Sequence, residues 1–147
     1  MDQRSTPISV EWLGTTYKTL LAASETAGRL SVFESLDQPG YGPPRHIHKA
    51  EDETFYVLSG AVEFWQEGQT TRHGPGDVVF IERGRNHTFR IIGDGPARMV
   101  TVMSPGGFDG FFAEMAKGRY QIPQDMAQIA RIGALYHLEF TGPPLGH

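Results

Sequence analysis

Cysteine is absent from this 147-residue sequence. Its absence excludes a disulfide framework and every metal site that uses a thiolate, so a metal could be held only by histidine, aspartate or glutamate. The same absence is typical of proteins that work in a reducing compartment, and we expect a cytoplasmic location. A chain of this length can bury one hydrophobic core without disulfide bonds or structural metals, so residues 1–147 are expected to form a single domain.

The sequence also has no basic run and no long apolar segment. Its 13 Lys and Arg residues are scattered, and 17 Asp and Glu residues bring the net charge to −4. No stretch could therefore neutralise a phosphate backbone, and we expect no nucleic-acid partner. No segment approaches the ~18 apolar residues of a membrane helix, and the first seven residues lack the apolar core of a secretion signal. We expect a soluble protein that does not use a membrane.

What the sequence has instead is a series of short apolar or alternating runs separated by Gly, Pro, Asp and Asn. This pattern is typical of an all-β, multi-strand antiparallel barrel or sandwich. The clearest hairpin turns at Ser59-Gly60, where glycine permits the positive φ that a tight turn needs. Strands are predicted at residues 17–23, 29–36, 54–59, 61–66, 77–81, 87–92 and 97–103.

After residue 104 the periodicity changes from that of strands to that of helices. One apolar face has the i, i+3, i+4, i+7 spacing and consists of Phe108, Phe111, Phe112 and Met115. A second helix is expected to open at Pro123. The aromatic stripe is interpreted first as core packing, with a lid across the barrel mouth as the alternative. The last seven residues are expected to form an irregular tail.

His46 and His48 are the first candidates for metal ligands. They lie two residues apart, so on an extended strand both imidazoles point to the same side. A carboxylate that follows, Glu51 or Glu53, could reach the same point, and the spacing alone leaves this choice open. A third histidine, His87, stands at the start of a predicted strand. Greek-key connections bring such sequence-distant strands together.

The spacing of these residues resembles a signature of a known family. From Gly40 to Gly60 the sequence follows G-x5-H-x-H-x4-E-x6-G, which resembles the first motif of the cupin superfamily at every defined position. The resemblance covers roughly residues 17–104 and implies a cupin-type antiparallel β-barrel, the double-stranded jelly roll. Two C-terminal helices would then form an extension over residues 105–135.

The family's second motif, G-x5-P-x-G-x2-H-x3-N, is matched in part. Gly76, Gly84 and His87 keep their places, whereas Glu82 replaces the proline and Ile91 replaces the asparagine. These departures affect a local turn and a strand end rather than the ligand set. The resemblance implies that one divalent transition metal per chain is bound by His46, His48, Glu53 and His87.

The residues themselves favour the same kind of metal. Three imidazoles and one carboxylate suit Fe, Mn, Ni, Co, Cu or Zn better than the oxygen-loving Mg or Ca. The segment from Val10 to Leu21 could add a strand to the sheet of a neighbouring copy and cover an exposed edge, so we expect a homodimer.

An apolar pocket is expected beside the metal, and it favours an aromatic or apolar small-molecule substrate. Its predicted lining is Val57, Val62, Phe64, Phe80 and Phe89. Glu53 is the predicted catalytic residue, a base that accepts a proton from an acidic substrate hydroxyl. The C-terminal pattern resembles quercetin dioxygenase-like cupins, which implies a metal-dependent dioxygenase acting on a flavonol-like or enolic aromatic molecule. A non-catalytic ligand-binding or sensing module and a metal-dependent isomerase or lyase are the alternatives.

Overall fold

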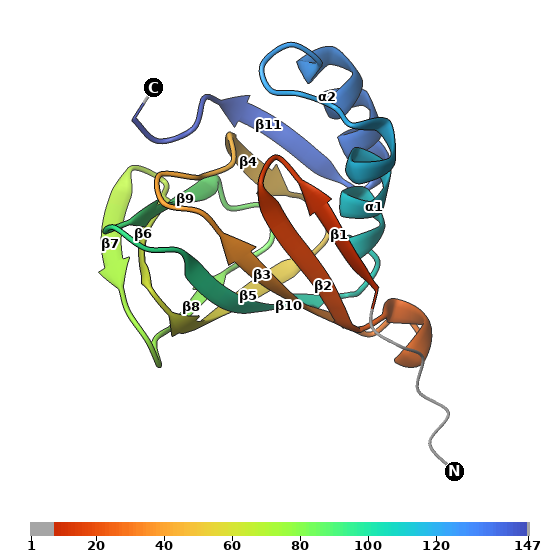
Figure 1. Cartoon of the computed structure of the whole chain (residues 1–147). Coiled ribbons are helices and arrows are strands. Elements are labelled where there is room, and N and C mark those ends of the chain that lie inside the picture. The colour runs from red at the N-terminus through yellow and green to blue at the C-terminus, as the bar shows by residue number, and fades with distance from the viewer. Residues whose placement is uncertain (1–7, 147) are drawn as a thin grey trace.

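The computed structural model describes residues 8–146. The first seven residues, in which no secretion signal was found, and His147 lie outside this range. The described chain forms two antiparallel β-sheets that face each other, with two helices at one end (Figure 1). The prediction of an all-β jelly-roll barrel with two helices near its C-terminus is confirmed.

The first sheet has the strand order β1-β2-β3-β10-β5-β8, and the second has the order β11-β4-β9-β6-β7. The first comprises β1 (Ser9–Trp12), β2 (Thr15–Leu21), β3 (Ser31–Asp37), β10 (Ala97–Ser104), β5 (Asp52–Ser59) and β8 (Val78–Ile81). The second comprises β11 (Leu138–Gly142), β4 (Arg45–His48), β9 (His87–Ile92), β6 (Ala61–Gln66) and β7 (Gln69–His73). A short 3-10 helix, η1 (Ala23–Glu25), precedes β3.

The interior holds two apolar clusters. The first lies inside the barrel and contains Phe55, Val57, Val62, Phe64, Val79, Ile81, Ile91, Ala97 and Met99. The second joins the N-terminal strands, the helices and β11, and it contains Trp12, Tyr17, Phe33, Met103, Phe108, Phe111, Met115, Ile129 and Leu138. Burying these side chains supplies the main driving force for folding.

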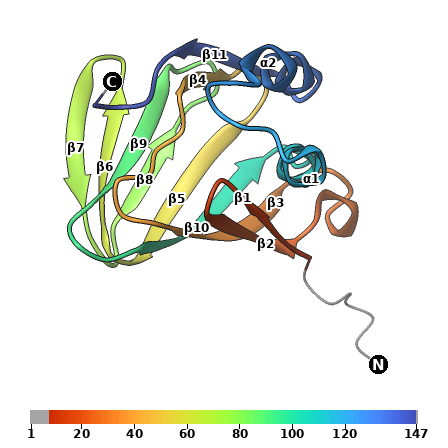
Figure 2. The same cartoon turned by 45° about the horizontal axis from the view of Figure 1, so that its top comes forward.

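The helices α1 (Asp109–Gly118) and α2 (Met126–Leu135) cover one end of the barrel. Figure 2 shows α1 beside β1 and α2 beside β11, and contacts join both pairs. The predicted aromatic stripe does pack into the core, since Phe111 and Met115 are buried. Neither helix among residues 8–146 has the length and apolar character needed to cross a lipid bilayer.

The structure differs from the sequence prediction in three segments. Thr141 and Gly142 belong to β11 rather than to an irregular tail, because β11 pairs with β4 far away in the sequence. The polar, exposed run of β7 was not predicted, since it has no apolar alternation. The segment from Val10 to Leu21 forms β1 and β2 in the chain's own sheet, with β1 at the edge. The homodimer stays a prediction.

Candidate metal centre

His46, His48, Glu53 and His87, called here the His/Glu cluster, come together in the interior of the barrel. Each offers one ligand atom, and these atoms all lie within 4.8 Å of one another. All four side chains are buried. The structure thus brings together the four residues that the sequence singled out.

The fold draws this cluster from both sheets. His46 and His48 lie on β4 with one residue between them, and the alternation of the strand turns both side chains inward. His46 pairs with His87 on the neighbouring strand β9. Glu53 lies on β5 in the opposite sheet and also points inward.

Backbone carbonyls fix the orientation of two of the imidazoles. The Nδ1 atom of His46 lies 2.7 Å from the oxygen of Pro44, and the Nδ1 atom of His87 lies 2.9 Å from the oxygen of Arg85. A carbonyl oxygen only accepts hydrogen bonds, so each Nδ1 carries a hydrogen. The Nε2 atom of His87 lies 3.0 Å from Oε1 of Glu53, at hydrogen-bonding distance. Outer contacts such as those at Nδ1 prepare histidines for a metal.

Glu51, the alternative carboxylate, lies on the other side of the His48 ring. Its Oε1 atom is 3.9 Å from Nδ1 of His48, whereas Oε1 of Glu53 is 3.6 Å from Nε2. Glu51 therefore lies outside the cluster and beyond hydrogen-bonding distance of His48, and Glu53 is the carboxylate in the cluster.

Burial keeps the histidines in the form that binds metals. Removal from water, together with the neighbouring His87, lowers the pKa of His46 and of His48 well below the ordinary value. Both rings therefore stay neutral near pH 7, and neutral imidazole is the metal-binding form. The donor set of three nitrogens and one carboxylate oxygen fits a divalent transition metal.

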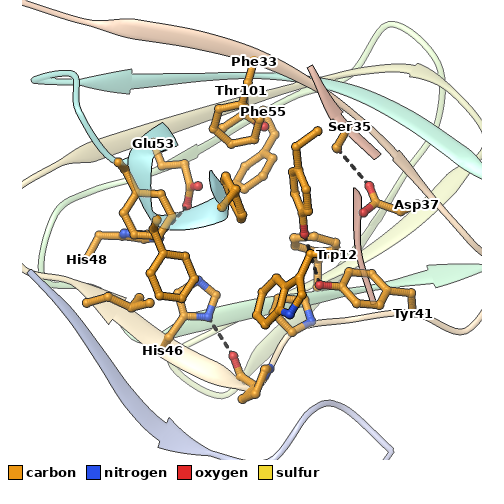
Figure 3. Close-up of a pocket in the computed structure, with 18 of the residues that line it drawn as sticks. Trp12, Phe33, Ser35, Asp37, Tyr41, His46, His48, Glu53, Phe55 and Thr101 are labelled. Atoms are coloured by element: carbon orange, nitrogen blue, oxygen red, sulfur yellow. Dashed lines mark hydrogen bonds and ion pairs between the residues drawn. The ribbon is translucent and has the colours of Figure 1, made fainter. Parts of the chain in front are cut away.

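A cavity opens beside the cluster and is walled mainly by aromatic side chains (Figure 3). The empty space in the cavity and at its mouth amounts to about 650 Å³, open solvent included. His46, His48 and Glu53 line it directly. Its aromatic wall comes from the barrel and from α1 and contains Trp12, Tyr17, Phe33, Tyr41, Phe55, Phe89, Phe108, Phe111 and Phe112.

The predicted pocket lining is corrected for four of its five residues. Phe89 lines the cavity, as expected. Phe80 is 56% exposed, because it alternates on β8 with the buried Val79 and Ile81 and so points out of the barrel. The remaining three predicted residues are fully buried in the first apolar cluster instead of lining the cavity: Val57, Val62 and Phe64.

Sequence reasoning missed a polar group that also lines the cavity. It consists of Tyr17, Ser35, Asp37 and Tyr41 and is called here the Asp37 cluster. Asp37 ends β3, where alternate residues point inward, and that alternation was the available signal. The Ser35 hydroxyl donates to Oδ2 of Asp37 at 2.9 Å, and the two tyrosine hydroxyls lie 3.3 Å apart.

Burial makes the members of this cluster resist ionisation. It raises the pKa of Asp37 to about 6, against the hydrogen bond from Ser35, which lowers it. Burial likewise raises the pKa of Tyr41 to about 12 and that of Tyr17 above its ordinary value. Near pH 7 the cluster therefore contains an ionised carboxylate beside two neutral phenols.

Asp37→Asn should raise the free energy of unfolding near neutral pH by up to roughly 3 kcal/mol. The pKa of Asp37 is about 6 in the folded protein and 3.8 without burial. The folded protein thus binds this proton more tightly than the unfolded chain does. The stability that the bound proton contributes is fully present below pH 3.8 and is lost as the pH rises through about 6. Asparagine has no charge to bury.

Urea unfolding of both proteins at about pH 4 and about pH 7.5 measures this difference. The gap between variant and wild type should widen with pH, because all other titrating groups are common to both proteins. A gap that does not change with pH would contradict the assignment to Asp37.

Comparisons with known proteins agree with this geometry. Residues 33–103 match the family described as the cupin domain. Quercetin 2,3-dioxygenase from Bacillus subtilis is 31% identical over 96 residues, which cover 65% of this chain and 28% of that protein. The tetracenomycin polyketide synthase protein TcmJ from Streptomyces glaucescens is 30% identical over 80 residues, or 54% of this chain and 52% of that one.

A solved structure gives a similar result. The polyketide cyclase RemF from Streptomyces resistomycificus has a TM-score of 0.59 and 26% identity, and the match covers 71% of this chain and 80% of that one. The chain spans between about a quarter and about a half of the length of the two curated relatives named above.

Proposed function

Because the chain belongs to the cupin superfamily, we propose that it is a metal-dependent dioxygenase that cleaves an enolic or flavonol-like aromatic molecule with dioxygen. One observation carries the proposal. The buried His/Glu cluster opens directly into a cavity whose walls are aromatic.

The walls of the cavity support an aromatic substrate. Planar rings gain stabilisation from stacked or edge-to-face contacts with aromatic side chains, in addition to the apolar area they bury. Phe112 stacks on Tyr17 with ring centroids 3.9 Å apart, and Phe108 stacks on Phe111 at 5.2 Å, so flat surfaces are already present. Small-molecule sites generally combine such apolar walls with a few polar groups.

The chemistry is divided between the metal and the chain. A transition metal held by His46, His48, Glu53 and His87 would supply Lewis-acid chemistry at an enolate oxygen of the substrate and would allow dioxygen to react beside it. Glu53 accepts the proton of the acidic hydroxyl at its Oε1 atom, which lies 3.0 Å from Nε2 of His87. Phe108 and Phe111 cover the cavity from the helical side and exclude water.

The relatives support two different reaction types. The Bacillus subtilis relative is named for quercetin, a flavonol, and so favours ring cleavage with dioxygen. The polyketide cyclase matches over a larger part of its own length and favours a reaction without dioxygen. A metal that stabilises an enolate and a carboxylate that moves a proton would serve an isomerase, lyase or cyclase equally well. A module that binds a ligand without turnover is the remaining alternative.

Oxygen uptake tests the proposal. Protein loaded anaerobically with Fe, Mn, Ni, Co or Cu is mixed with quercetin, and air is then admitted. We expect at least one metal form to consume dioxygen and quercetin together, and the metal-free protein to consume neither. Product that forms before air is admitted would favour the non-oxidative alternative. Binding of quercetin with no consumption in any metal form would overturn the proposal.

A further inference from the structure

The Asp37 cluster and the His/Glu cluster lie on different sides of one cavity. Figure 3 shows Ser35, Asp37 and Tyr41 across from His46, His48 and Glu53, with Trp12 between the two groups in this view. Both groups are lining residues of the same space. A ligand that reaches the His/Glu cluster therefore has a second set of polar contacts available to it.

Two buried polar atoms at this second end make no hydrogen bond of good geometry within residues 8–146: Oδ1 of Asp37 and the hydroxyl oxygen of Thr15. The Thr15 hydroxyl nevertheless lies close enough to the Asp37 carboxylate to lower its pKa. Asp37 lines the cavity and is 1% exposed. A buried polar atom without a partner costs free energy, and a ligand that supplies the missing hydrogen bond removes this cost.

The charge at this end selects the kind of ligand. The cavity lining contains a carboxylate and two phenols at this end, but neither lysine nor arginine from the described part of the chain. An anionic group on a ligand would therefore meet Asp37 without compensation. A neutral hydroxyl would instead donate a hydrogen bond to the free oxygen, and a hydrogen bond to an ionised acceptor is among the stronger ones.

We propose that the Asp37 cluster is a binding site for a phenolic hydroxyl at the end of an aromatic ligand that lies away from the His/Glu cluster. The hydroxyl donates to Oδ1 of Asp37, whose other oxygen is held by Ser35. The substrate class is then an aromatic molecule with hydroxyl groups at both ends and without a carboxylate or phosphate at the Asp37 end. This inference rests on the proposed function for its ligand, but it concerns binding and not turnover.

Two flavonols that share the enolic hydroxyl and differ in their phenolic hydroxyls provide the probe. Quercetin carries phenolic hydroxyls on both of its ring systems, and 3-hydroxyflavone retains the enolic hydroxyl but lacks the others. Binding of each is measured without dioxygen, by calorimetry and by quenching of tryptophan fluorescence, since Trp12 lines the cavity. The proteins compared are wild type, Asp37→Asn, Asp37→Leu and the surface control Asp94→Asn.

We expect wild type to bind quercetin more tightly than 3-hydroxyflavone. Asp37→Leu should weaken quercetin binding by about ten- to a hundredfold and leave 3-hydroxyflavone unaffected, with Asp37→Asn intermediate and Asp94→Asn like wild type. Equal losses for both flavonols, or no loss for either, would overturn the proposal. A circular dichroism melt of each variant separates a lost contact from a lost fold.

A second pair of probes tests the exclusion of anions. Wild type should bind 2-naphthol more tightly than 2-naphthoate, and Asp37→Asn should reduce that preference. Equal affinity of wild type for the two would overturn the proposal. Selective quercetin binding that depends on Asp37, without any oxygen uptake, would leave this inference standing while the dioxygenase proposal fails. Oxygen uptake together with quercetin binding that does not depend on Asp37 would support the dioxygenase proposal and contradict this inference.

Discussion

His48→Ala should leave the protein without stoichiometric metal, with an affinity reduced by more than about 100-fold. Changes to residues that only support a metal ligand cost about ten- to a hundredfold, and removing a ligand costs more. His48 is 3% exposed, and its Nε2 atom faces Oε1 of Glu53 at 3.6 Å. No other histidine among residues 8–146 belongs to the cluster beyond His46 and His87, so nothing replaces the lost ring.

Elemental analysis of the protein as isolated, followed by titration with Co²⁺ and recording of its absorption bands, measures this loss. His73→Ala is the matched control, because His73 lies on β7 outside the cluster and contacts Thr71 and Asp77. The control should keep one metal per chain. If His48→Ala kept one as well, the assignment of the ligands would be refuted.

Glu53→Gln should keep a bound metal and lose about 10²- to 10⁴-fold in turnover. The three histidines remain in place, and the glutamine carbonyl can still accept a hydrogen bond in the position of Oε1. A neutral amide, however, cannot take the proton of a substrate hydroxyl. The loss should therefore appear in kcat measured per bound metal, and not in the metal content.

Turnover and metal content are measured on the same samples of this variant. Glu63→Gln serves as the control, since Glu63 lies on β6 and pairs with Arg72 and Arg90 away from the cavity. Wild-type turnover in Glu53→Gln would show that another group accepts the proton. Loss of the metal would show that the charge of Glu53 is required for metal binding.

The His/Glu cluster was predictable because its signal is local. His46 and His48 share one face of a strand for a reason that depends on two residues alone. The strand that brings His87 beside them follows from the antiparallel order of a jelly roll. The prediction failed where a side chain's surroundings depend on which elements dock together.

Phe80 and Trp12 illustrate this difference. The run Val78–Ile81 is apolar throughout, so its sequence does not show which residues face outward. In the structure it forms the edge strand β8, and alternate residues are exposed. Trp12 reaches the cavity only because β1 folds back on β2 and packs against α1, a contact between segments about a hundred residues apart. Local periodicity does not encode such docking.

Asp37 escaped prediction for another reason. A single acid after an alternating run usually marks the polar end of a strand. Here the alternation of β3 continues through it and places Ser31, Phe33, Ser35 and Asp37 on the buried face. Its inward position conflicts with the usual preference of a carboxylate for water, and such conflicts are found where binding is favoured over stability.

The position of β11 bears on when a metal enters the protein. The ligands lie on β4, β5 and β9, which all end by Ile92, whereas β11, the strand that pairs with β4, spans Leu138–Gly142. The elements that close over the cavity, α1 and β11, emerge later, and β11 then pairs Leu138 with His48. All four ligands thus precede, in the sequence, the elements that cover the cavity. We expect the metal content to reflect which metals are abundant while the nascent chain folds, more than the preferences of the finished site.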